Sequence, residues 1–330
     1  MVTIKVLKTG LFTTVQDLGR HGFRKYGITV GGAMDRLSLR AANILVGNAE
    51  DEAGLEMTLT GPVLCFNEDA WIAITGSDFS PSINGHPVPM RRPVLIKKGS
   101  ILEFRASQNG RLAYLGLAGG IQVPKVMDSK STYTQAGIGG YFGRALAKGD
   151  LLPIRSHEIR YGFEKDFASE RWGIGSNVLP SYTKEKIIHI TEGPEFGLFP
   201  DTAHECLFNS YYCIGTESNR MGYRLQGPSL NYDPKDMLSS PVAPGTIQVP
   251  PDGQPIILMA DCQTTGGYPR IGHVIQTDLP KLAQAKPGDR IRFKLISMNE
   301  AHRRLFKQEK VFRLLKKAVQ MRCQYGSNGF

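Results

Sequence analysis

The chain has 330 residues, which is too long for one simple core, so two packed domains are expected. Hydrophobic residues at 41% and charged residues at 21% lie near globular averages and exclude a disordered chain, a collagen-like repeat and a coiled coil. The 37 glycines and 20 prolines are typical of many short strands joined by tight turns, so the composition predicts a mainly β protein.

The net charge of +10 is concentrated in the last part of the chain. Residues 300–330 contain eight Lys and Arg against two Glu, a net charge of +6, whereas the other 299 residues carry only +4. Because the basic residues belong to one segment, we expect no nucleic-acid groove in the fold and no nucleic-acid partner. The spacing of apolar residues such as Phe312 and Val319 predicts a C-terminal amphipathic helix over residues 300–321.

The cysteines and the hydropathy pattern indicate a cytoplasmic protein. The five cysteines show no spacing typical of a zinc or thioredoxin-like site, so reduced thiols are expected. The first residues run directly into a strand-like alternation that lacks the features of a signal peptide. No segment approaches the roughly 18 apolar residues of a membrane helix, so no membrane partner is expected.

An early helix is predicted from Arg36 to Val46, with Asp35 as its cap and Gly47 as its stop. The segment Gly31-Gly32-Ala33-Met34 precedes it. Backbone N–H groups at a helix N-terminus can hold a carboxylate, carbonyl or phosphate oxygen, so this loop is a candidate site. The alternative is that the glycines only form the bend and Asp35 only caps the helix.

A second polar loop follows the apolar strand Trp71–Ile74. The residues Thr75-Gly76-Ser77-Asp78 place a carboxylate and two hydroxyl groups at a strand end, a frequent position for ligand-binding groups. Asp78 could act as a general base or accept a hydrogen bond from an amide N–H. The alternative is that Asp78 only shapes an Asx-turn.

A turn followed by an alternating strand occurs three times. These turns are Lys98-Gly99-Ser100, Lys148-Gly149-Asp150 and Pro287-Gly288-Asp289. Each has Gly where the turn needs a positive φ. Two further echoes, Gly61-Pro62 and Gly193-Pro194 before apolar residues, favour a duplication that relates residues 60–155 to residues 190–296. The alternative is that such turns are common in any β protein.

The segment Tyr161–Tyr182 has few apolar residues at either period and is expected to connect the two halves. Beyond it, Ser218–Arg224 offers two guanidinium groups that could each bind a carboxylate in bidentate fashion. The alternative is a surface salt bridge, which is preferred for Arg224.

The most polar run extends from Thr246 to Pro269. A buried strand, Ile256–Ala260, precedes a group of donors and acceptors before a double-glycine turn. That group consists of Asp261, Gln263, Thr264 and Thr265, with Gln248 on the preceding segment. Gln and Thr side chains can match the N–H and C=O of an amide-bearing substrate together. The alternative is a hydrogen-bonded β corner.

Several common catalytic signatures are excluded. No Gly-x-x-x-x-Gly-Lys-[Ser/Thr] phosphate loop occurs, and Phe142 replaces the third glycine of a dinucleotide fingerprint in residues 137–143. His204-Glu205 lacks the second histidine of a zincin helix, and no Gly-x-Ser-x-Gly elbow is present. The isolated histidines, which are His21, His189 and His273, are expected to be solvated or hydrogen-bonded, and no metal is expected.

A series of longer motifs runs in order through residues 3–296. They are Thr14-Val-Gln-Asp-Leu-Gly-Arg20, Gly31-Gly-Ala-Met-Asp35 with Ser38 and Ala42-Asn43, Leu55-Glu56, Gly119-Gly120, Gly139-Gly140 with Gly143-Arg144, Ser218-Asn-Arg-Met-Gly-Tyr-Arg-Leu225, Gly245-Thr-Ile-Gln-Val-Pro250 and Asp261-Cys-Gln-Thr-Thr-Gly-Gly-Tyr-Pro269. With these motifs the chain resembles the KipA family. That family is also called the 5-oxoprolinase C subunit, allophanate hydrolase subunit 2 or biotin-dependent carboxyltransferase-like family.

The resemblance implies a mainly β fold of two cyclophilin-like β-barrel domains with a few short helices and a C-terminal amphipathic helix. We therefore expect an N-terminal barrel over residues 1–175, a C-terminal barrel over residues 176–298 and a basic helical tail over residues 299–330. The turn-and-strand repeats found independently agree with this expectation.

The resemblance also implies an activity, the ATP-dependent opening of 5-oxo-L-proline to L-glutamate. This chain would be one member of a three-part complex with a KipI-like protein (the 5-oxoprolinase B subunit) and a third protein (the 5-oxoprolinase A subunit), and inactive alone. One alternative is to bind KipI and relieve its inhibition of a sporulation sensor histidine kinase. Another is half of a urea-type carboxyltransferase. That interpretation is disfavoured because no Ala-Met-Lys-Met-like site for covalently attached biotin occurs.

For the 5-oxoprolinase interpretation, candidate residues follow from the loops above. The catalytic candidates are Asp35, Asp78, Thr264 and Thr265, and the substrate-binding candidates are Gly31, Gly32, Arg220, Gln248 and Gln263. In this hypothesis the aspartates act as acid and base, Thr and backbone N–H groups stabilise the oxyanion, and Arg220 binds the substrate carboxylate. Because the chain has no phosphate loop, ATP is expected on a partner or at an interface.

Overall fold

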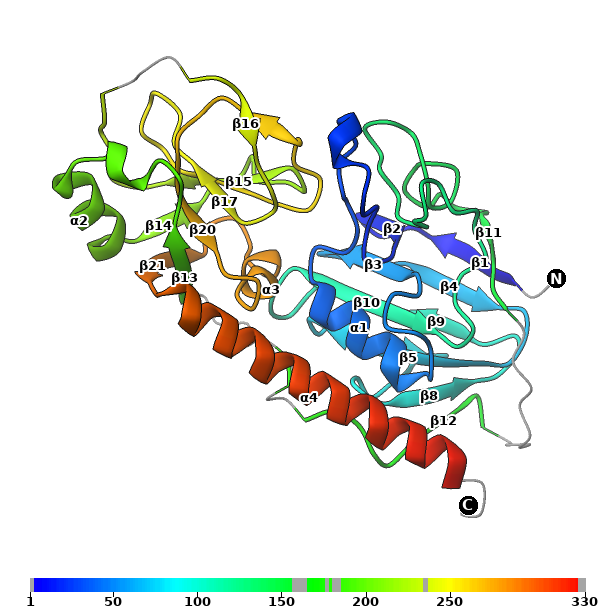
Figure 1. Ribbon diagram of the computed structural model, residues 1–330. Coiled ribbons are helices and arrows are strands. Elements are labelled where there is room, and N and C mark those ends of the chain that lie inside the picture. The colour runs from blue at the N-terminus through cyan, green and yellow to red at the C-terminus, as the bar shows by residue number, and fades with distance from the viewer. Residues whose placement is uncertain (1–2, 156–164, 176–177, 180–184, 234–236, 326–330) are drawn as a thin grey trace. The chain divides into compact units, whose positions relative to one another are not determined.

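The computed structural model describes residues 3–155, 165–175, 178–179, 185–233 and 237–325 (Figure 1). Contacts divide the chain into two compact units. The first comprises Met1–Gly19, Asp35–Pro180 and Glu309–Phe330, and the second comprises Arg20–Met34 and Ser181–Gln308. Both units are therefore discontinuous in sequence, which differs from the three consecutive segments that we predicted.

The first unit is built on two six-stranded sheets. The strands are β1 (Thr3–Lys8), β2 (Phe12–Gln16), β3 (Gly54–Thr58), β4 (Val63–Phe66), β5 (Ala70–Gly76), β6 (Ser82–Ile83), β7 (His86–Pro87), β8 (Pro93–Ile96), β9 (Ile101–Glu103), β10 (Leu112–Leu117), β11 (Leu151–Pro153) and β12 (Phe167–Ser169). One sheet has the order β11-β1-β4-β9-β6-β7 and the other β12-β8-β5-β10-β3-β2. Inward residues of both sheets, such as Ile4 and Leu115, share one hydrophobic core. A short 3-10 helix, η1 (Arg24–Tyr26), lies in the part of the chain that belongs to the second unit.

The second unit contains a closed seven-stranded barrel in the order β13-β20-β17-β18-β15-β14-β21. These strands are β13 (Glu185–Glu192), β14 (Tyr212–Ile214), β15 (Gly222–Gln226), β17 (Thr246–Gln248), β18 (Ile256–Leu258), β20 (Arg270–Val274) and β21 (Arg290–Leu295). The other elements are η2 (Phe196–Leu198), α2 (Asp201–Asn209), α3 (Leu279–Ala283) and a two-stranded sheet of β16 (Ser240–Pro241) and β19 (Thr265–Gly266). The mainly β prediction is confirmed. The barrel appears in this unit, whereas the described strands of the first unit pair as two sheets.

The local signals in the sequence correspond closely to the structure. Helix α1 spans Arg36–Leu45 and has Asp35 as its N-cap, as predicted. The three predicted turn glycines all have positive φ and directly precede β9, β11 and β21. The echo at Gly193-Pro194 is different, because Glu195 and the residues after it form the η2 turn instead of a strand.

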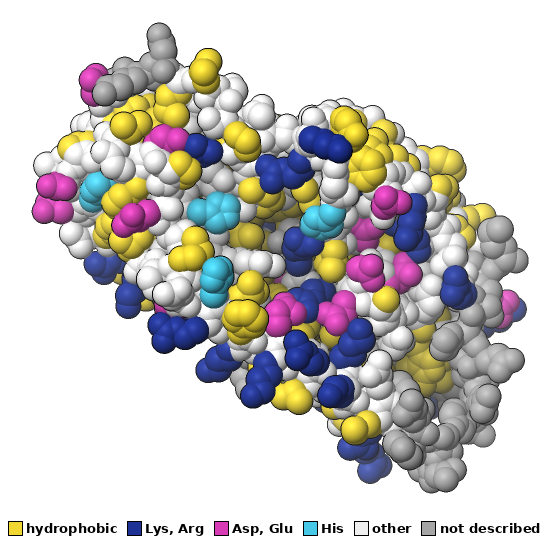
Figure 2. Space-filling view, in the orientation of Figure 1, with side chains coloured by type: hydrophobic (Ala, Val, Ile, Leu, Met, Phe, Trp, Pro, Cys, Tyr) yellow, Lys and Arg dark blue, Asp and Glu magenta, His cyan; other side chains and the backbone are white. Residues whose placement is uncertain are grey.

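Helix α4 (Met298–Tyr325) confirms the predicted amphipathic helix but is part of a core rather than a tail. Phe312 and Val319 are buried with residues of α1, such as Ile44, in one hydrophobic cluster of the first unit. Lys and Arg side chains follow the length of this helix (Figure 2). Among the described residues, none of the helices is both long and apolar enough to cross a membrane.

An ion-pair network adds to the α4 contact. The Arg40 guanidinium donates to both oxygens of Glu309, at 2.7 Å each, and to Glu50 at 2.7 and 2.9 Å. The same guanidinium stacks 4.5 Å above the centre of the Phe312 ring. The hydrogen bond to Arg40 keeps the pKa of Glu309 below its usual value. Charged and apolar contacts therefore fix the same turn of α4.

The expected connector also belongs to the first unit. Part of Tyr161–Tyr182 lies outside the described residues. Within the described part, β12 pairs with β8, and Ile174 and Leu179 are buried in the cluster that holds α1 and α4. The segment is therefore built into a sheet and a core.

We predict that Phe312→Ala lowers the free energy of unfolding by about 3–5 kcal/mol, because it deletes a fully buried ring and leaves a cavity. Phe306→Ala is the matched control on the same helix, since that ring is 76% exposed and its loss should change stability by less than about 0.5 kcal/mol. Urea unfolding followed by circular dichroism measures both. Equal effects of the two substitutions would contradict the packing of α4 described above.

Candidate functional site

A buried ion pair lies in the second unit between the loop before β15 and the turn after β18. Arg220 Nε donates to Asp261 Oδ2 at 2.7 Å, and Arg220 Nη2 donates to Asp261 Oδ1 at 3.0 Å. The side chains are only 16% and 6% exposed. The Asp261 backbone N–H also donates to the Arg220 carbonyl at 2.8 Å. This bidentate geometry fixes both residues in orientation.

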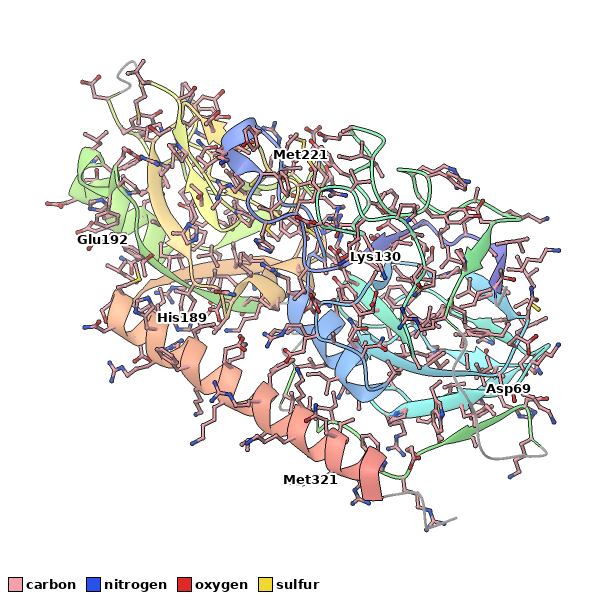
Figure 3. All side chains as sticks on the ribbon, turned by 45° about the vertical axis from the view of Figure 1, so that its right-hand side comes forward. Asp69, Lys130, His189, Glu192, Met221 and Met321 are labelled. Atoms are coloured by element: carbon pink, nitrogen blue, oxygen red, sulfur yellow. The ribbon has the colours of Figure 1, made fainter. Side chains whose placement is uncertain are left out.

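The double-glycine loop of residues 20–34 is bound to this pair. Arg220 Nη2 donates to the Gly32 carbonyl at 2.6 Å. The Gly31 N–H donates to the Ala260 carbonyl at 3.1 Å, and the Thr29 hydroxyl donates to the Cys262 carbonyl at 2.9 Å. Met221, labelled in Figure 3, follows Arg220 at the start of this region. The sequence prediction that Gly31, Gly32 and Arg220 lie together is thus met within one unit.

Gly31 shows why the loop needs glycine. Its φ is +62°, in the left-handed region that other residues adopt at a cost. A Cβ there would lie 3.5 Å from Asp261 Oδ1 and 3.6 Å from Arg20 Nη1. Both charged groups therefore lie close to the Gly31 backbone. Arg20, whose side chain is fully buried, and Asp261 were not among the predicted site residues, although each occurs in a motif of the sequence.

Two predicted amide side chains touch each other beside this region. Gln248 is buried, and its Nε2 donates to the Tyr268 carbonyl at 3.2 Å. Gln263 Nε2 donates to Gln248 Oε1 at 3.4 Å. Gln248 also lies against the backbone of Gly266, where a Cβ would come within 2.6 Å of Gln248 Nε2. The β-corner alternative accounts for these contacts.

Thr264 and Thr265 lie at the edge of the small β16–β19 sheet. The Thr264 carbonyl accepts a hydrogen bond from the Val242 N–H at 3.0 Å, and Thr265 pairs with Pro241. Thr264 is half-buried, whereas Thr265 is exposed. Thr264 is therefore the better placed of the two to act inside a site.

Asp35 belongs to the first unit and acts as a helix cap. Its two oxygens accept hydrogen bonds from the Ser38 N–H at 3.0 Å and the Ser38 hydroxyl at 2.6 Å. Its backbone N–H donates to the Tyr114 hydroxyl, which donates in turn to Glu56, each at 2.7 Å. Burial and the charge of Glu56 raise the pKa of Tyr114 well above its ordinary value. The capping alternative accounts for the contacts of Asp35.

Asp78 also belongs to the first unit, and its contact matches the Asx-turn alternative. Asp78 Oδ1 accepts a hydrogen bond from the Ser80 N–H at 2.7 Å, and the side chain lies at the surface. The two predicted catalytic aspartates thus belong to a different unit from the Arg220–Asp261 pair.

The motif around Asp17 is likewise structural. The buried Asp17 carboxylate accepts hydrogen bonds from the Gly19 N–H at 2.8 Å, the Ser129 hydroxyl at 2.7 Å and the Lys130 N–H at 2.6 Å. The Ser131 hydroxyl also donates to it. One carboxylate therefore joins the end of β2 to a loop more than a hundred residues later.

Two of the histidines are hydrogen-bonded, as expected. His189, labelled in Figure 3, has Nδ1 2.8 Å from Asp278 Oδ2, and its backbone N–H donates to the same oxygen at 2.8 Å. Lys281 pairs with the other Asp278 oxygen at 2.7 Å. His273 has Nδ1 3.4 Å from the Thr246 hydroxyl, and burial lowers its pKa.

The cysteines show no sign of nucleophilic activation. The four whose side chains are described are free thiols. Burial raises the pKa of Cys262, next to Asp261, to about 12. A thiolate at neutral pH is therefore disfavoured at this position. Among the described residues, no group of three or more His, Cys, Asp or Glu could hold a metal ion.

Comparison with known proteins identifies the family. Residues 26–295 match the family described as carboxyltransferase domain, subdomain A and B. The chain belongs to this carboxyltransferase family. It is 40% identical over 313 residues to the 5-oxoprolinase C subunit of Escherichia coli, and the match covers 94% of this chain and 97% of that protein. The resemblance seen in the sequence motifs is thereby confirmed.

Urea-degrading enzymes contain the same carboxyltransferase domain within longer chains. The urea amidolyase of Saccharomyces cerevisiae is 35% identical over 305 residues, which are 88% of this chain but only 16% of that protein. The crystal structure of the Kluyveromyces lactis urea amidolyase superposes with a TM-score of 0.88 at 32% identity, over 95% of this chain and 20% of that one. The fold of this carboxyltransferase family member is thus shared with a domain of a larger enzyme.

We predict that Asp261→Asn lowers stability by about 3–5 kcal/mol, because it leaves the Arg220 guanidinium buried without its countercharge. Glu185→Gln is the matched control, since its ion pair with Arg290 is 52% exposed on both sides and should contribute less than about 1 kcal/mol. Chemical denaturation of both variants tests the difference. A cost for Asp261→Asn no larger than that of the control would show that the pair is not needed for stability.

A pH dependence follows from the lowered pKa of His273. The unfolded chain has the ordinary value of 6.5 and binds a proton more readily than the folded chain. Stability should therefore be highest above pH 6.5 and fall as the pH drops through 6.5 towards the folded-state value. His273→Gln should flatten this part of the curve of melting temperature against pH. His86→Gln, at an exposed position, should leave the slope unchanged.

Proposed function

We propose that the chain is a subunit of an ATP-dependent 5-oxoprolinase that opens 5-oxo-L-proline to L-glutamate. The observation that carries this proposal is the 40% identity to the 5-oxoprolinase C subunit of Escherichia coli, over 97% of that protein. The corresponding protein of Haemophilus influenzae supports it, at 38% identity over 93% of its length. The partners in this proposal are a KipI-like protein, which is the 5-oxoprolinase B subunit, and a third protein, which is the 5-oxoprolinase A subunit.

The reaction makes specific chemical demands. An unstrained lactam is a poor electrophile, so ATP would activate it by phosphorylating its oxygen before water attacks. The attack needs a carboxylate to take a proton from water, and it needs donors towards the oxygen on which negative charge develops. A small ligand of this kind is bound by polar groups that converge within one pocket.

In this proposal Asp261 is the acid and base, and Arg220 is a positioning residue. A carboxylate can accept about four hydrogen bonds, so Asp261 has capacity beyond its two bonds from Arg220. Arg220 is engaged by Asp261 and the Gly32 carbonyl, which argues against its predicted role on the substrate carboxylate. Asp35 and Asp78 are replaced in the proposal because their contacts are those of a helix cap and an Asx-turn.

The donors in this proposal are the Thr264 hydroxyl and the Gly32 N–H. The Gly31 N–H is already bonded to the Ala260 carbonyl and is not assigned this role. Gln248 and Gln263, whose amides touch, would recognise the N–H and C=O of the lactam. ATP would bind on a partner or at an interface with it, and this chain would carry no covalent biotin.

A second candidate is the carboxyltransferase reaction of urea-degrading enzymes. It is supported by the family description and by the TM-score of 0.88 with the Kluyveromyces lactis urea carboxylase, at 31% identity. Biotin would then have to arrive on a separate carrier protein. The higher identity to the 5-oxoprolinase proteins favours the first proposal.

The test measures glutamate release from 5-oxo-L-proline and ATP with this chain alone, with its KipI-like partner, and with both partners together. Activity is expected only in the complete mixture. Asp261→Asn should lower kcat by about 100-fold or more, the usual loss on removing a general base. Glu185→Gln, at an exposed ion pair of the same unit, should leave the rate unchanged. Size-exclusion chromatography checks that both variants still assemble.

Two results would contradict the proposal. Tight binding of the KipI-like protein with no turnover in any mixture would favour the kinase-regulating role. Urea-dependent loss of carboxyl groups from a carboxybiotin carrier, with no glutamate release, would favour the carboxyltransferase.

A further inference from the structure

The first unit contains a cavity of about 780 Å³ that the proposed function does not use. It lies between the loop after β5, the residues before β8 and the turn that contains Gly173. Its lining includes three guanidinium groups and several other polar groups, notably Arg91, Arg92, Arg105, Asp78, Ser80 and Asn109. Its volume is within the range of about 300–1,000 Å³ typical of small-molecule sites.

Two of the arginines have buried donors without acceptors. The Nε atoms of Arg91 and Arg92 are buried and, within the described part of the chain, have no hydrogen-bond partner. Arg92 Nη1 is oriented by a bond of 3.2 Å to the Glu170 carbonyl. A buried charged donor without an acceptor is costly, so a ligand that supplies acceptor oxygens would be stabilised here.

The backbone holds these arginines in place. Arg91 has φ of +61° and Ser80 has φ of +46°, both in the left-handed region that non-glycine residues rarely adopt. The Arg91 N–H donates to the Ile74 carbonyl at 2.7 Å, and the Arg91 carbonyl accepts from the Ile174 N–H at 2.8 Å. A Cβ at Gly173 would come within 2.5 Å of the Arg91 carbonyl oxygen. The strained conformation at Arg91 is therefore fixed from two sides.

The charge of the lining points to the class of ligand. Three guanidinium groups against the one carboxylate of Asp78 leave a formal charge of +2. The Asp78 carboxylate is partly neutralised by the Ser80 N–H. A phosphate dianion matches this charge, and its tetrahedral oxygens suit the planar fork of arginine donors.

We infer that this cavity binds a phosphate-bearing small molecule, with phosphate oxygens on Arg91 and Arg92. Arg105, which is exposed, adds charge at the solvent side of the site. Free phosphate and the phosphates of a nucleotide share this chemistry. The inference goes beyond the proposed function, because binding can be measured without turnover and without any partner protein.

Isothermal titration of the full-length chain with inorganic phosphate, ADP and ATP tests the inference. Binding of all three with similar affinity would identify free phosphate as sufficient, and binding of the nucleotides alone would identify a nucleotide site. Both results support the inference. Failure of all three to bind at millimolar concentration would overturn it.

Two variants locate the binding. Arg91→Gly removes a guanidinium while allowing the positive φ, and Arg92→Gln removes the charge of its neighbour. Each should weaken binding at least 10-fold. Arg155→Gln, at an exposed arginine of the same unit that does not line the cavity, is the matched control and should bind as the wild type does.

Melting temperatures separate loss of the site from loss of the fold. Phosphate that binds the folded chain should raise the wild-type melting temperature. Arg91→Gly alone should melt no lower than the wild type, because glycine relieves the strained backbone, but phosphate should no longer raise its melting temperature. Equal protection of wild type and variant by phosphate would overturn the inference, whether or not the 5-oxoprolinase activity is found.

Discussion

Buried carboxylates determine where the chain changes direction. Asp17 joins the end of β2 to residues 129–131, and Asp35 begins α1 and connects through Tyr114 to Glu56. Between these two aspartates the chain belongs to the second unit. Each carboxylate receives several directed hydrogen bonds, which offset the cost of removing its charge from water. The double-glycine loop and its contacts with Arg220 depend on these two fixed ends.

What could be predicted from the sequence was what short segments determine. Helix α1 and the turns before β9, β11 and β21 follow from caps, spacing and glycine, all of which act over a few residues. The partner of Arg220 lies 41 residues away, and that of Asp17 more than a hundred, so no local pattern identifies them. For Asp35 the cap was visible, but whether it only caps depended on contacts with distant side chains. The motifs identified the family correctly because structural and chemical residues are both part of them.

The arginines of this chain have two different environments. Arg220 has a carboxylate and a carbonyl as partners, so its charge is compensated and its role is to hold others in place. Arg91 and Arg92 have buried donor atoms for which the described residues supply no acceptor, and the backbone at Arg91 is strained. Strain and unsatisfied donors are retained where a protein gains something by them, most often at a binding site. The two environments thus distinguish a structural guanidinium from one available to a ligand.

The position of α4 also affects the order in which the protein folds during synthesis. The first unit begins at the N-terminus, yet Phe312 and Val319 complete one of its hydrophobic clusters. The ribosome makes these residues only after it has made the whole of the second unit. The apolar faces of α1 and Ile174 must therefore stay uncovered while more than a hundred further residues are synthesised. A nascent chain in this state exposes apolar surface, so synthesis is the stage at which this protein is most exposed to aggregation.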